Sequence, residues 1–597
     1  MLVYLAQRNA ALKVTRLLLV LVLIPSSALM VLALPNLAYA QSELVVNVNQ
    51  GNITTANKLS LGFMLDWEWQ AYVSDNKPKE LARQAMFKLV RVFDHRVSPC
   101  TSWDETTRTG TCSWTKVDAL VHAILETGAE PMFCMGTSLS NGPVIPSGMS
   151  VDPNTDLPYP ESFAAYASEW VKHFRAAGLP VRFYEIWNEP WTYVAGWQSG
   201  PIDYAKLANY MQLYSVTAGS MRQSNPEVLI SFDYIVRKPL LDYWLANGGA
   251  DVDYIDSHKY DSGSVGELTN AEMIARAESR YFDTSPLGYG ISQARQVWAN
   301  ARGKLLPIII SESNFNSAYA NGTDPRIQQM VGAVWTALVL RMAALQEVSY
   351  YTYYRLSTPA SFSMAKPSGG RGFGMINQDD YQPWYPYYVY RMIGSSLAVG
   401  DQFVEATSSS ADLRTLAWTH NGMLKILLVC TIDEPRTMYL QGATGKASLL
   451  KIDNTIPWTT PNEQSQVVDL GAPLTFNGYT VALLTIGSQN GLSISNSGDI
   501  AVGIGGSGSN TISVAVAGAL PDSIALSCVN GLPSGASCNF NPEFGNTSFS
   551  SNLTISTSSS TPVGTFSVKV AGTAGQISDF TSFTLTVNAP TLIVRRR

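Results

Sequence analysis

Charged residues are scarce in this sequence of 597 residues, since Asp, Glu, Lys and Arg make up only 14% of it and hydrophobic residues 46%. The sequence has no basic patch, and its one cationic run is the arginine triplet 595–597. Proteins that bind nucleic acid neutralise many phosphates with Lys and Arg, so a nucleic-acid partner is not expected. The composition is that of a globular protein, and ~150 residues per domain allows about three or four domains.

Cysteine is also rare, with six residues in the chain. Cys100 and Cys112 flank one polar loop and Cys528 and Cys538 flank another, so each pair is predicted to form a local disulfide in an oxidising compartment. The other two cysteines lie in apolar segments and are predicted to be buried thiols. No cysteine spacing is typical of a zinc or redox site, and no dense carboxylate loop is typical of calcium. We therefore expect neither a metal nor a cofactor.

The first 40 residues contain three basic residues and no acidic one. An apolar run over residues 17–40 follows the cations and ends in the small-residue sequence Ala-Tyr-Ala. This order is typical of a secretory signal, so we expect cleavage after Ala40 and an extracellular protein. Pro25 and Pro35 argue against the alternative, an uncleaved membrane-spanning helix. Cleavage leaves 37 basic residues (40 minus 3) and 46 acidic ones, a formal charge of −9.

Residues 41–400 alternate short apolar segments with helical patterns. The helix predicted from Trp114 ends at Gly128, and the helix predicted from Glu161 ends at Gly178. Strands that alternate with helices favour parallel βα units, and eight such units in about 340 residues predict a closed (β/α)8 TIM barrel. The predicted strands are 59–67, 87–95, 130–138, 181–189, 227–235, 253–260, 307–315 and 348–356.

The remainder of the chain is β-type. Residues 401–488 include two strand patterns around an Asn421-Gly422 turn and predict a small β-sandwich, to which residues 41–58 could add a strand. A Gly/Ser-rich stretch leads to residues 489–590, where short alternating strands predict an immunoglobulin-like β-sandwich. Phrases such as "GLPSGASCNFNP" resemble an Ig-like module that is often appended to secreted microbial hydrolases. Residues 591–597 form a basic tail.

Polar residues gather where the predicted barrel strands end. In a (β/α)8 barrel these carboxyl ends meet at one mouth, where active sites lie. Two carboxylates there, Glu189 and Glu312, suit glycosidic bond cleavage, because one can protonate the leaving oxygen while the other attacks or activates water. Aromatic rings offer flat apolar faces for sugars, although any one of them could equally pack in the core. The candidate rings are Trp67, Trp187, Trp191, Trp197 and Trp384. The candidate site residues are Glu189, Glu312, Asn188, Arg91, His258, Tyr260, Trp67 and Trp191.

The motif "YEIWNEP" resembles the strand-four signature of the clan-A retaining glycoside hydrolases. "VRVFDH", "DYIDSHKY" and "IIISESNFNS" resemble their strand-two, strand-six and strand-seven segments. The chain is most similar to glycoside hydrolase family 39, with families 5, 30, 51 and 79 as neighbours. It departs from family 39 at Ser313, where an aromatic residue is usual, and in a long loop over residues 136–160.

The resemblance implies a role for each matching residue. Glu189 would be the general acid/base and Glu312 the nucleophile. Asn188 would bond the sugar 2-hydroxyl, and His258 would line the sugar subsite. Tyr260 would donate to Glu312, while the charge of Arg91 would keep Glu312 ionised. Glu185 lies on the same face of the strand as Glu189 but deeper in the barrel, and it is expected to be a buried core carboxylate.

These expectations favour a secreted, monomeric, retaining β-glycosidase acting on a β-1,4-linked polysaccharide as an endo-enzyme. An exo-acting β-xylosidase is the alternative within the same class, since the long loop could close a pocket. An alternative of another class is a non-catalytic carbohydrate-binding surface protein, which predicts that one of the two glutamates is missing or misplaced. The terminal arginines leave an association with the cell surface open.

Overall fold

The structure is a computed structural model. The predicted signal sequence, the arginine tail and Trp197 lie outside the residues that it describes. Among the described residues, no helix combines the length and the apolar character needed to cross a membrane. The described residues are 43–139, 142–195, 201–233, 235–283, 288–318, 322–359, 371–456, 463–487, 491–517, 522–575 and 577–589.

Eight parallel strands form the barrel, and each lies within the segment predicted for it or overlaps it closely. Neighbouring strands follow the order β11-β10-β6-β3-β2-β14-β13-β12, and a short strand β7 pairs with β6. The sequence therefore predicts both the number of strands and their order. The strands are β2 (Ser60–Leu65), β3 (Leu89–Phe93), β6 (Glu130–Leu139), β10 (Phe183–Asn188), β11 (Leu229–Ser231), β12 (Ile255–Ser262), β13 (Ile308–Asn316) and β14 (Tyr350–Tyr353).

Isolated hydrogen bonds, in place of a continuous ladder, close the barrel between β11 and β12. The Asp253 N–H donates to the Ile230 carbonyl at 2.9 Å, and the Ser231 hydroxyl donates to the Tyr254 carbonyl at 2.7 Å. Most barrel strands are buried on both sides, as expected for parallel strands covered by helices, and every residue of β13 is buried. This burial places the few polar side chains of these strands in the barrel interior or at its mouth.

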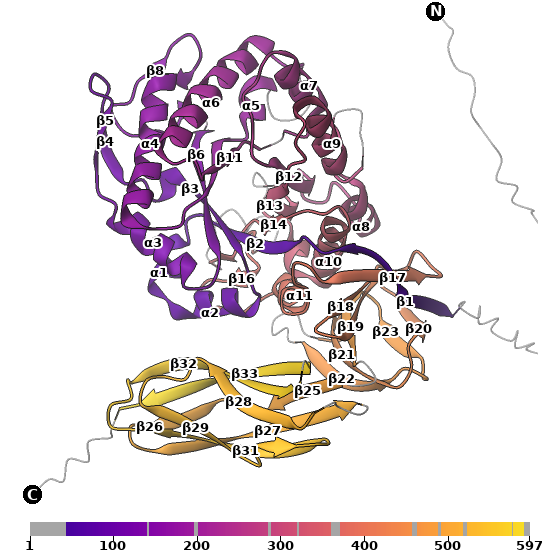
Figure 1. Cartoon of the computed structure of the whole chain (residues 1–597). Coiled ribbons are helices and arrows are strands. Elements are labelled where there is room, and N and C mark those ends of the chain that lie inside the picture. Colours follow the sequence, from indigo (N-terminus) through magenta and orange to yellow (C-terminus); the bar gives the residue numbers. More distant parts are fainter. Residues whose placement is uncertain are drawn as a thin grey trace, which may run out of the picture. The chain divides into compact units, whose positions relative to one another are not determined.

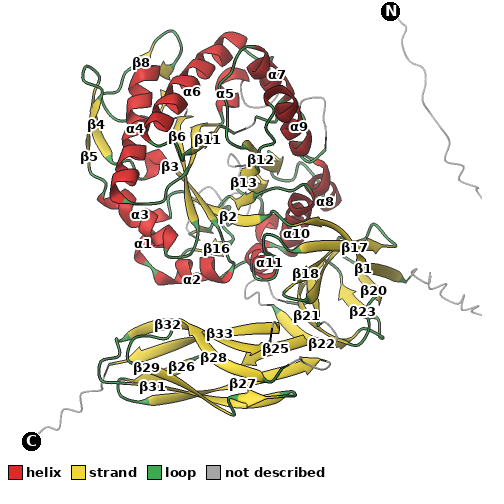
Figure 2. Ribbon diagram, in the orientation of Figure 1, coloured by secondary structure: helices red, strands yellow, loops and turns green. Residues whose placement is uncertain are grey.

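Helices surround the strands, as Figure 2 shows in red around yellow. Helix α4 illustrates the local cause: Phe163, Trp170 and Phe174 face inward, and Gly178 ends the helix in the left-handed conformation (φ 69°). The helices of the barrel are α1 (Trp69–Ser74), α2 (Asn76–Gln84), α3 (Thr115–Leu125), α4 (Pro160–Ala177), α5 (Pro190–Ala195), α6 (Tyr204–Ser224), α7 (Lys238–Ala246), α8 (Asn270–Ser279), α9 (Ile291–Arg302), α10 (Met330–Leu345) and α11 (Tyr385–Gly394).

Shorter elements occupy the loops of the barrel. Strands β8 and β9 form a small hairpin within the long loop 136–160. These elements are β4 (Cys100–Asp104), β5 (Thr109–Cys112), β7 (Gly142–Pro143), β8 (Val151–Asp152), β9 (Leu157–Pro158), β15 (Ser357–Thr358), β16 (Ile376–Asn377) and the 3-10 turns η1 (Asp94–Arg96) and η2 (Pro325–Gln328).

A nine-stranded sheet follows the barrel in the sequence and also takes up the segment that precedes it. Strand β1 (Leu44–Ala56) runs antiparallel to β17 and parallel to β20, so the segment before the barrel lies in this sheet. Asn421 and Gly422 form the predicted hairpin turn, with φ values of 49° and 75°. The other strands are β17 (Gln402–Ser408), β18 (Leu413–His420), β19 (Met423–Cys430), β20 (Pro435–Gln441), β21 (Lys446–Asp453), β22 (Gln464–Asp469), β23 (Leu474–Asn477) and β24 (Thr480–Ile486).

The last part of the chain has two sheets that share one apolar core, with Leu492 and Ile512 from one sheet and Val568 and Leu585 from the other. That is the layout of a β-sandwich, while its immunoglobulin-like character stays a prediction. One sheet has the order β25-β27-β31-β29 and the other β26-β33-β32-β28-β30. The strands are β25 (Gly491–Asn496), β26 (Ile500–Gly503), β27 (Ser507–Ala517), β28 (Ile524–Asn530), β29 (Ala536–Asn541), β30 (Phe544–Gly545), β31 (Phe549–Thr557), β32 (Gly564–Ala574) and β33 (Ile577–Asn588).

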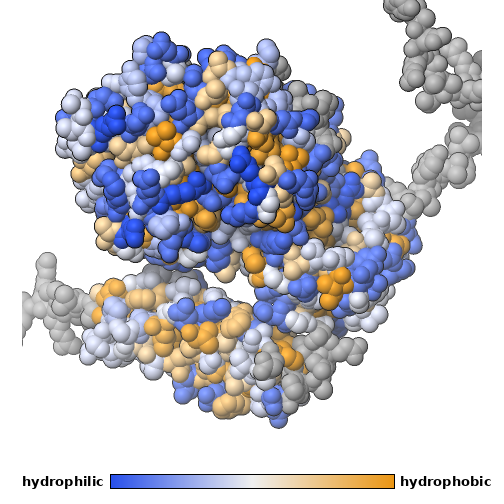
Figure 3. Space-filling view, turned by 45° about the horizontal axis from the view of Figure 1, so that its top comes forward, coloured by the Kyte–Doolittle hydropathy of each residue, from blue (hydrophilic) through white to orange (hydrophobic). Residues whose placement is uncertain are grey.

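The cysteines pair as the sequence predicts. Disulfides join Cys100 to Cys112 and Cys528 to Cys538, and the remaining two, Cys134 and Cys430, are buried thiols. Figure 1 follows the chain by colour from the barrel (indigo to magenta) to the β-rich part (orange to yellow). The face in Figure 3 mixes hydrophilic and hydrophobic residues, as expected for a chain with few charges.

Candidate active site

Strand β10 delivers Asn188 and Glu189 to the mouth of the barrel through an unusual backbone. Trp187 and Glu189 both adopt the left-handed region, with φ values of 72° and 49°. Non-glycine residues seldom do so, and such strain is concentrated at functional sites. Pro190 then starts α5, where its missing N–H costs nothing because the first N–H groups of a helix have no partner within it. The strand thus stops abruptly at the glutamate.

Glu312 lies on β13, with an exposed fraction of 8%, and both of its oxygens have partners. Arg91 Nη1 donates to Oε2 at 2.8 Å, and the Tyr260 hydroxyl donates to Oε1. Arg91 comes from β3 and Tyr260 from β12, the strand that pairs with β13. The contacts to Arg91 and Tyr260 that the resemblance implies are both present, and they stabilise the ionised carboxylate.

Arg91 is fully buried and connects three functional side chains. Besides Glu312, its Nε donates to Glu185 Oε2 at 2.8 Å and its Nη2 donates to Asn188 Oδ1 at 2.8 Å. Burial acts to lower the pKa of Arg91, but Glu185 and then Cys134 and Glu312 outweigh it, so that the pKa lies well above its ordinary value. The guanidinium is therefore a permanent positive charge at the base of the site.

Glu189 has a different environment, although its exposed fraction is also 8%. Its Oε1 lies 3.1 Å from His258 Nδ1, and its backbone N–H donates to Asp233 Oδ2 at 2.7 Å. The ring of His258 is fully buried, and its Nδ1 lies 4.0 Å from Glu312 Oε2. His258 therefore stands beside both glutamates.

The two glutamates approach each other closely. One carboxylate oxygen of Glu189 and one of Glu312 lie, together with a nitrogen of His258, within 4.8 Å of one another. Carboxyl groups about 5–5.5 Å apart are typical of retaining glycosidases, and a separation of about 6.5–9.5 Å is typical of inverting ones. The short separation is that of the retaining class.

A hollow of about 450 Å³, its open mouth included, lies against Glu189 and Tyr260. Trp191 lines it with an exposed fraction of 5%, and the Arg237 guanidinium lies 4.4 Å from the centre of the Trp191 ring. Arg280 also lines the hollow, which gives this side of the site two cations next to Glu189. Sequence reasoning missed both arginines, because each lies in a loop or at a helix end without a motif.

Trp67 follows β2 at the same end of the barrel and is half exposed, at 50%. The guanidinium groups of Arg96 and Arg355 lie 4.6 Å and 5.3 Å from its ring centre. Asp66 contacts both arginines, and Glu68 contacts Arg355 at 3.1 Å. The carboxylates beside Trp67 thus hold arginines that flank the exposed ring.

Several other predicted candidates belong to the core. Glu185 is fully buried beneath Arg91, as expected for a core carboxylate. Trp187 and Trp384 have exposed fractions of 1% and 4% and pack in the interior, so neither ring is a sugar platform. Burial raises the pKa of Glu68 to about 7, although the attraction of Arg355 acts to lower it.

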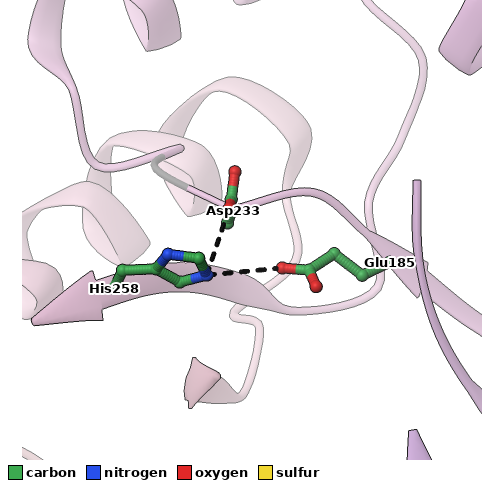
Figure 4. A group of neighbouring side chains, drawn as sticks. All are labelled: Glu185, Asp233 and His258. Carbon is green, nitrogen blue, oxygen red and sulfur yellow. Dashed lines mark ion pairs between the residues drawn. The ribbon is translucent and has the colours of Figure 1, made fainter. Parts of the chain in front are cut away.

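Among the residues that the structure describes, two groups of side chains could hold a metal ion. Glu185, Asp233 and His258 offer ligand atoms within 4.8 Å of one another, and so do Glu189, His258 and Glu312. In the first group, drawn in Figure 4, His258 Nε2 lies 3.1 Å from Asp233 Oδ2 and 3.9 Å from Glu185 Oε1. Arg91 already supplies positive charge there through its bond to Glu185. The site can thus balance its carboxylates with Arg91 and protons.

Asp233 is the polar residue of the site that sequence reasoning missed most clearly. It follows β11 and is fully buried, and its pKa is raised well above the ordinary value by burial and by the negative charges of Glu185 and Glu189. Its signal was available, because an aspartate directly after the apolar segment "VLISF" lies at the end of a barrel strand. No motif marks the position, however.

A family model supplies independent support for the resemblance. Residues 63–424, more than half of the chain, match the model of glycosyl hydrolases family 39. The chain belongs to this family. It is therefore a retaining clan-A glycoside hydrolase, and the alternative of a non-catalytic surface protein is not supported, because both glutamates are present at one mouth.

Solved structures show the same fold at low identity. The family 39 enzyme from Xanthomonas axonopodis pv. citri is 17% identical, has a TM-score of 0.54 and matches over 76% of this chain and 99% of its own. A monomeric β-xylosidase from Caulobacter crescentus CB15 is 17% identical, with a TM-score of 0.52 over 74% of this chain and 99% of its own. A bacterial orthologue of human α-L-iduronidase is 13% identical, with a TM-score of 0.51 over 91% and 100%. No curated protein matches the sequence.

Proposed function

We propose that this protein is a secreted retaining β-glycosidase that hydrolyses β-1,4-linked polysaccharide, with Glu312 as the nucleophile and Glu189 as the general acid/base. The observation that carries the proposal is the placement of carboxylate oxygens of Glu189 and Glu312 within 4.8 Å. Such a close approach favours the retaining mechanism, in which the second carboxylate itself attacks because no water fits beneath the sugar.

In the first step, a Glu312 oxygen attacks the anomeric carbon while Glu189 gives its proton to the glycosidic oxygen. The carbon–oxygen bond to the leaving sugar breaks, and a covalent glycosyl-enzyme forms. Arg91 and Tyr260 hold the carboxylate of Glu312 in place for this attack. Because Asn188 Oδ1 accepts from Arg91, the amide NH₂ of Asn188 is left to donate to the sugar 2-hydroxyl.

In the second step, water attacks the same anomeric carbon. Glu189, now a carboxylate, takes a proton from the water, and the bond to Glu312 breaks, which restores both side chains. Two inversions leave the anomeric configuration unchanged, so the first product of a β-linked substrate is the β-sugar. No cofactor takes part in this scheme.

Action within a polymer is supported by the half-exposed ring of Trp67. It lies outside the Glu189–Glu312 pair but at the same end of the barrel, where a second sugar of a chain could pack on it. An exo-acting β-xylosidase is the second candidate. It is favoured by the fold shared with the Caulobacter β-xylosidase and by the long loop 136–160, which carries the β8–β9 hairpin.

Secretion is supported by the signal-like residues 1–40 and by two disulfides. Sequencing the N-terminus of protein recovered from the culture medium tests this part of the proposal, and residue 41 is the expected start.

The experiment that tests the substrate is hydrolysis of a panel of β-1,4-glucan, β-1,4-xylan and matching aryl glycosides, with product sizes recorded. Oligosaccharides of mixed length in the first minutes are expected for endo action. Monosaccharide alone would replace that proposal by the exo candidate. Proton NMR of the same reaction should show the β-anomer first, and an initial α-anomer would contradict the assignment of Glu312.

A further inference from the structure

Asp233 contacts the backbone of Glu189, the proposed acid/base, and also the histidine that lies beside the Glu189 side chain. Its Oδ2 accepts the Glu189 backbone N–H at 2.7 Å and lies 3.1 Å from His258 Nε2. The other ring nitrogen, Nδ1, lies 3.1 Å from Glu189 Oε1. One carboxylate oxygen thus contacts the main chain of Glu189 directly and its side chain through an imidazole ring. Figure 4 shows the part of this arrangement that joins Asp233 to His258.

This arrangement matters because Glu189 has an unfavourable backbone. A φ of 49° is costly for a glutamate and persists only where surrounding contacts hold it. The N–H bond to Asp233 is such a contact, since it is short and both groups are buried. Without it the backbone at Glu189 would lose this bond to the residue that follows Phe232 after β11.

The ring of His258 needs an anchor as well. It is fully buried, and the charged groups that face it are Asp233 and Glu185 at Nε2, and Glu189 and Glu312 at Nδ1. Of the two carboxylates at Nε2, Asp233 is the nearer by 0.8 Å (3.9 Å minus 3.1 Å). A carboxylate beside one ring nitrogen sets the orientation of an imidazole, and with it the nitrogen presented to the next group.

We propose that Asp233 is a positioning residue for the acid/base: it holds the strained backbone of Glu189 and the ring of His258, so that Glu189 presents its second oxygen, Oε2, to the leaving group. The inference rests on the proposed role of Glu189. Asp233 does not touch the substrate and acts only through its two neighbours. Proton transfer depends on a placement accurate to a fraction of an ångström, so loss of this anchor should affect the acid step first.

The test compares kcat/KM, which reports the first chemical step, on two substrates of the same sugar. One is an unactivated oligosaccharide that needs protonation of its leaving group, and the other is a dinitrophenyl glycoside that does not. Asp233→Ala should lose about 10- to 100-fold on the oligosaccharide and less than about 3-fold on the aryl glycoside. Equal losses on the two substrates would show a merely structural role and overturn the proposal.

Asp256→Asn is the matched control, because Asp256 is a second fully buried aspartate of the same barrel interior, without a contact to Glu189 or His258 among those the structure describes. Its ratio of kcat/KM on the two substrates should equal that of the wild type. The same split in Asp256→Asn would mean that the loss of any buried carboxyl group has this effect, and would overturn the proposal. If Asp233→Ala does not fold, Asp233→Asn is measured instead. The difference between its losses on the two substrates should be smaller, because its amide oxygen can still accept the Glu189 N–H.

A double variant separates this inference from the proposed function. In a Glu189→Gln background the further change Asp233→Ala should cost less than about 3-fold on the oligosaccharide, because the group it positions is gone. A full second loss would overturn the inference alone. If Glu189→Gln alone loses kcat/KM equally on both substrates, the proposed role of Glu189 as the general acid is instead wrong. Activity that is lost on dialysis against a chelator and restored by a divalent cation would replace the positioning role by a metal site.

Discussion

The two glutamates on opposite sides of the barrel mouth have different neighbours, although they are the same kind of residue. Glu312 lies between a guanidinium and a phenol, and both donate to it. Glu189 lies against an imidazole, which can donate or accept, and its backbone is held by another carboxylate. Exposure does not distinguish the two glutamates, since both have an exposed fraction of 8%.

The difference shows how neighbours assign chemistry to identical residues. A fixed cation and a hydroxyl donor stabilise only the ionised carboxylate, which is the form a nucleophile needs. An imidazole can accompany both the protonated and the ionised form, which an acid that later acts as a base requires. Variants that alter one glutamate or its neighbours and leave the other unchanged can test this division.

Glu312→Gly should have the largest effect. Loss of the attacking group should lower kcat on the order of 10⁵- to 10⁶-fold, as for attacking side chains of other covalent enzymes. Formate or azide placed in the vacated space should restore turnover of an aryl glycoside with a good leaving group. The measurement is the release of the aryl group with and without the added anion, together with the anomer of any glycosyl azide. The α-azide is expected from Glu312→Gly and the β-azide from Glu189→Gly, because the two vacated spaces lie on opposite faces of the sugar.

Glu189→Gln should have the next largest effect, and it should depend on the substrate. An amide cannot donate a proton, so kcat/KM on an unactivated oligosaccharide should fall about 10²- to 10⁴-fold. On a dinitrophenyl glycoside the first step should be nearly unchanged. Rates measured across a series of aryl leaving groups check this, with a steeper dependence on leaving-group pKa expected for the variant. An unchanged dependence would place the acid elsewhere.

Tyr260→Phe tests the hydroxyl part of the nucleophile's environment. A hydrogen bond to a charged group is worth about 1.5–3 kcal/mol, so kcat should fall about 10- to 100-fold while Arg91 still holds the carboxylate. Tyr184→Phe is a suitable control, because its hydroxyl is buried in the same barrel and has no hydrogen-bond partner among the described residues. A loss of equal size in both variants would point to general damage to the barrel.

Much of this architecture could be predicted from the sequence. Eight apolar segments separated by helical patterns predict a barrel, and the rule that active sites lie at the carboxyl ends of its strands brings Arg91, Glu189 and Glu312 together. The strand ends were less certain: β11 covers three residues, Leu229–Ser231, of the nine predicted. Its ladder to β10 stops early, and only isolated bonds join it to β12.

What could not be predicted depends on side-chain direction and distance. Asp233 and Asp256 resemble any other buried or surface aspartate in the sequence, and only the fold shows that one contacts Glu189 and the other does not. Trp187 and Trp191 are four residues apart, yet one packs in the core and the other lines the hollow. The difference between the two tryptophans arises from the turn at residues 187–189, and no sequence motif predicts its left-handed backbone.

Asp256→Asn should have the smallest effect on activity, within about 2-fold. It sharpens the comparison because Asp256 has no hydrogen bond to Glu189 or Glu312 among the described residues. Burial, followed by the negative charge of Glu185, raises the pKa of Asp256 well above the ordinary value of 3.8. A carboxyl whose pKa is raised by folding contributes stability below its unfolded pKa and loses that contribution as the pH rises through the folded pKa. The variant lacks this group, so its stability relative to the wild type should increase between pH 4 and pH 8. Urea unfolding midpoints at both pH values measure the effect, and a relative stability that does not change with pH would show that Asp256 is not held in its neutral form by the fold.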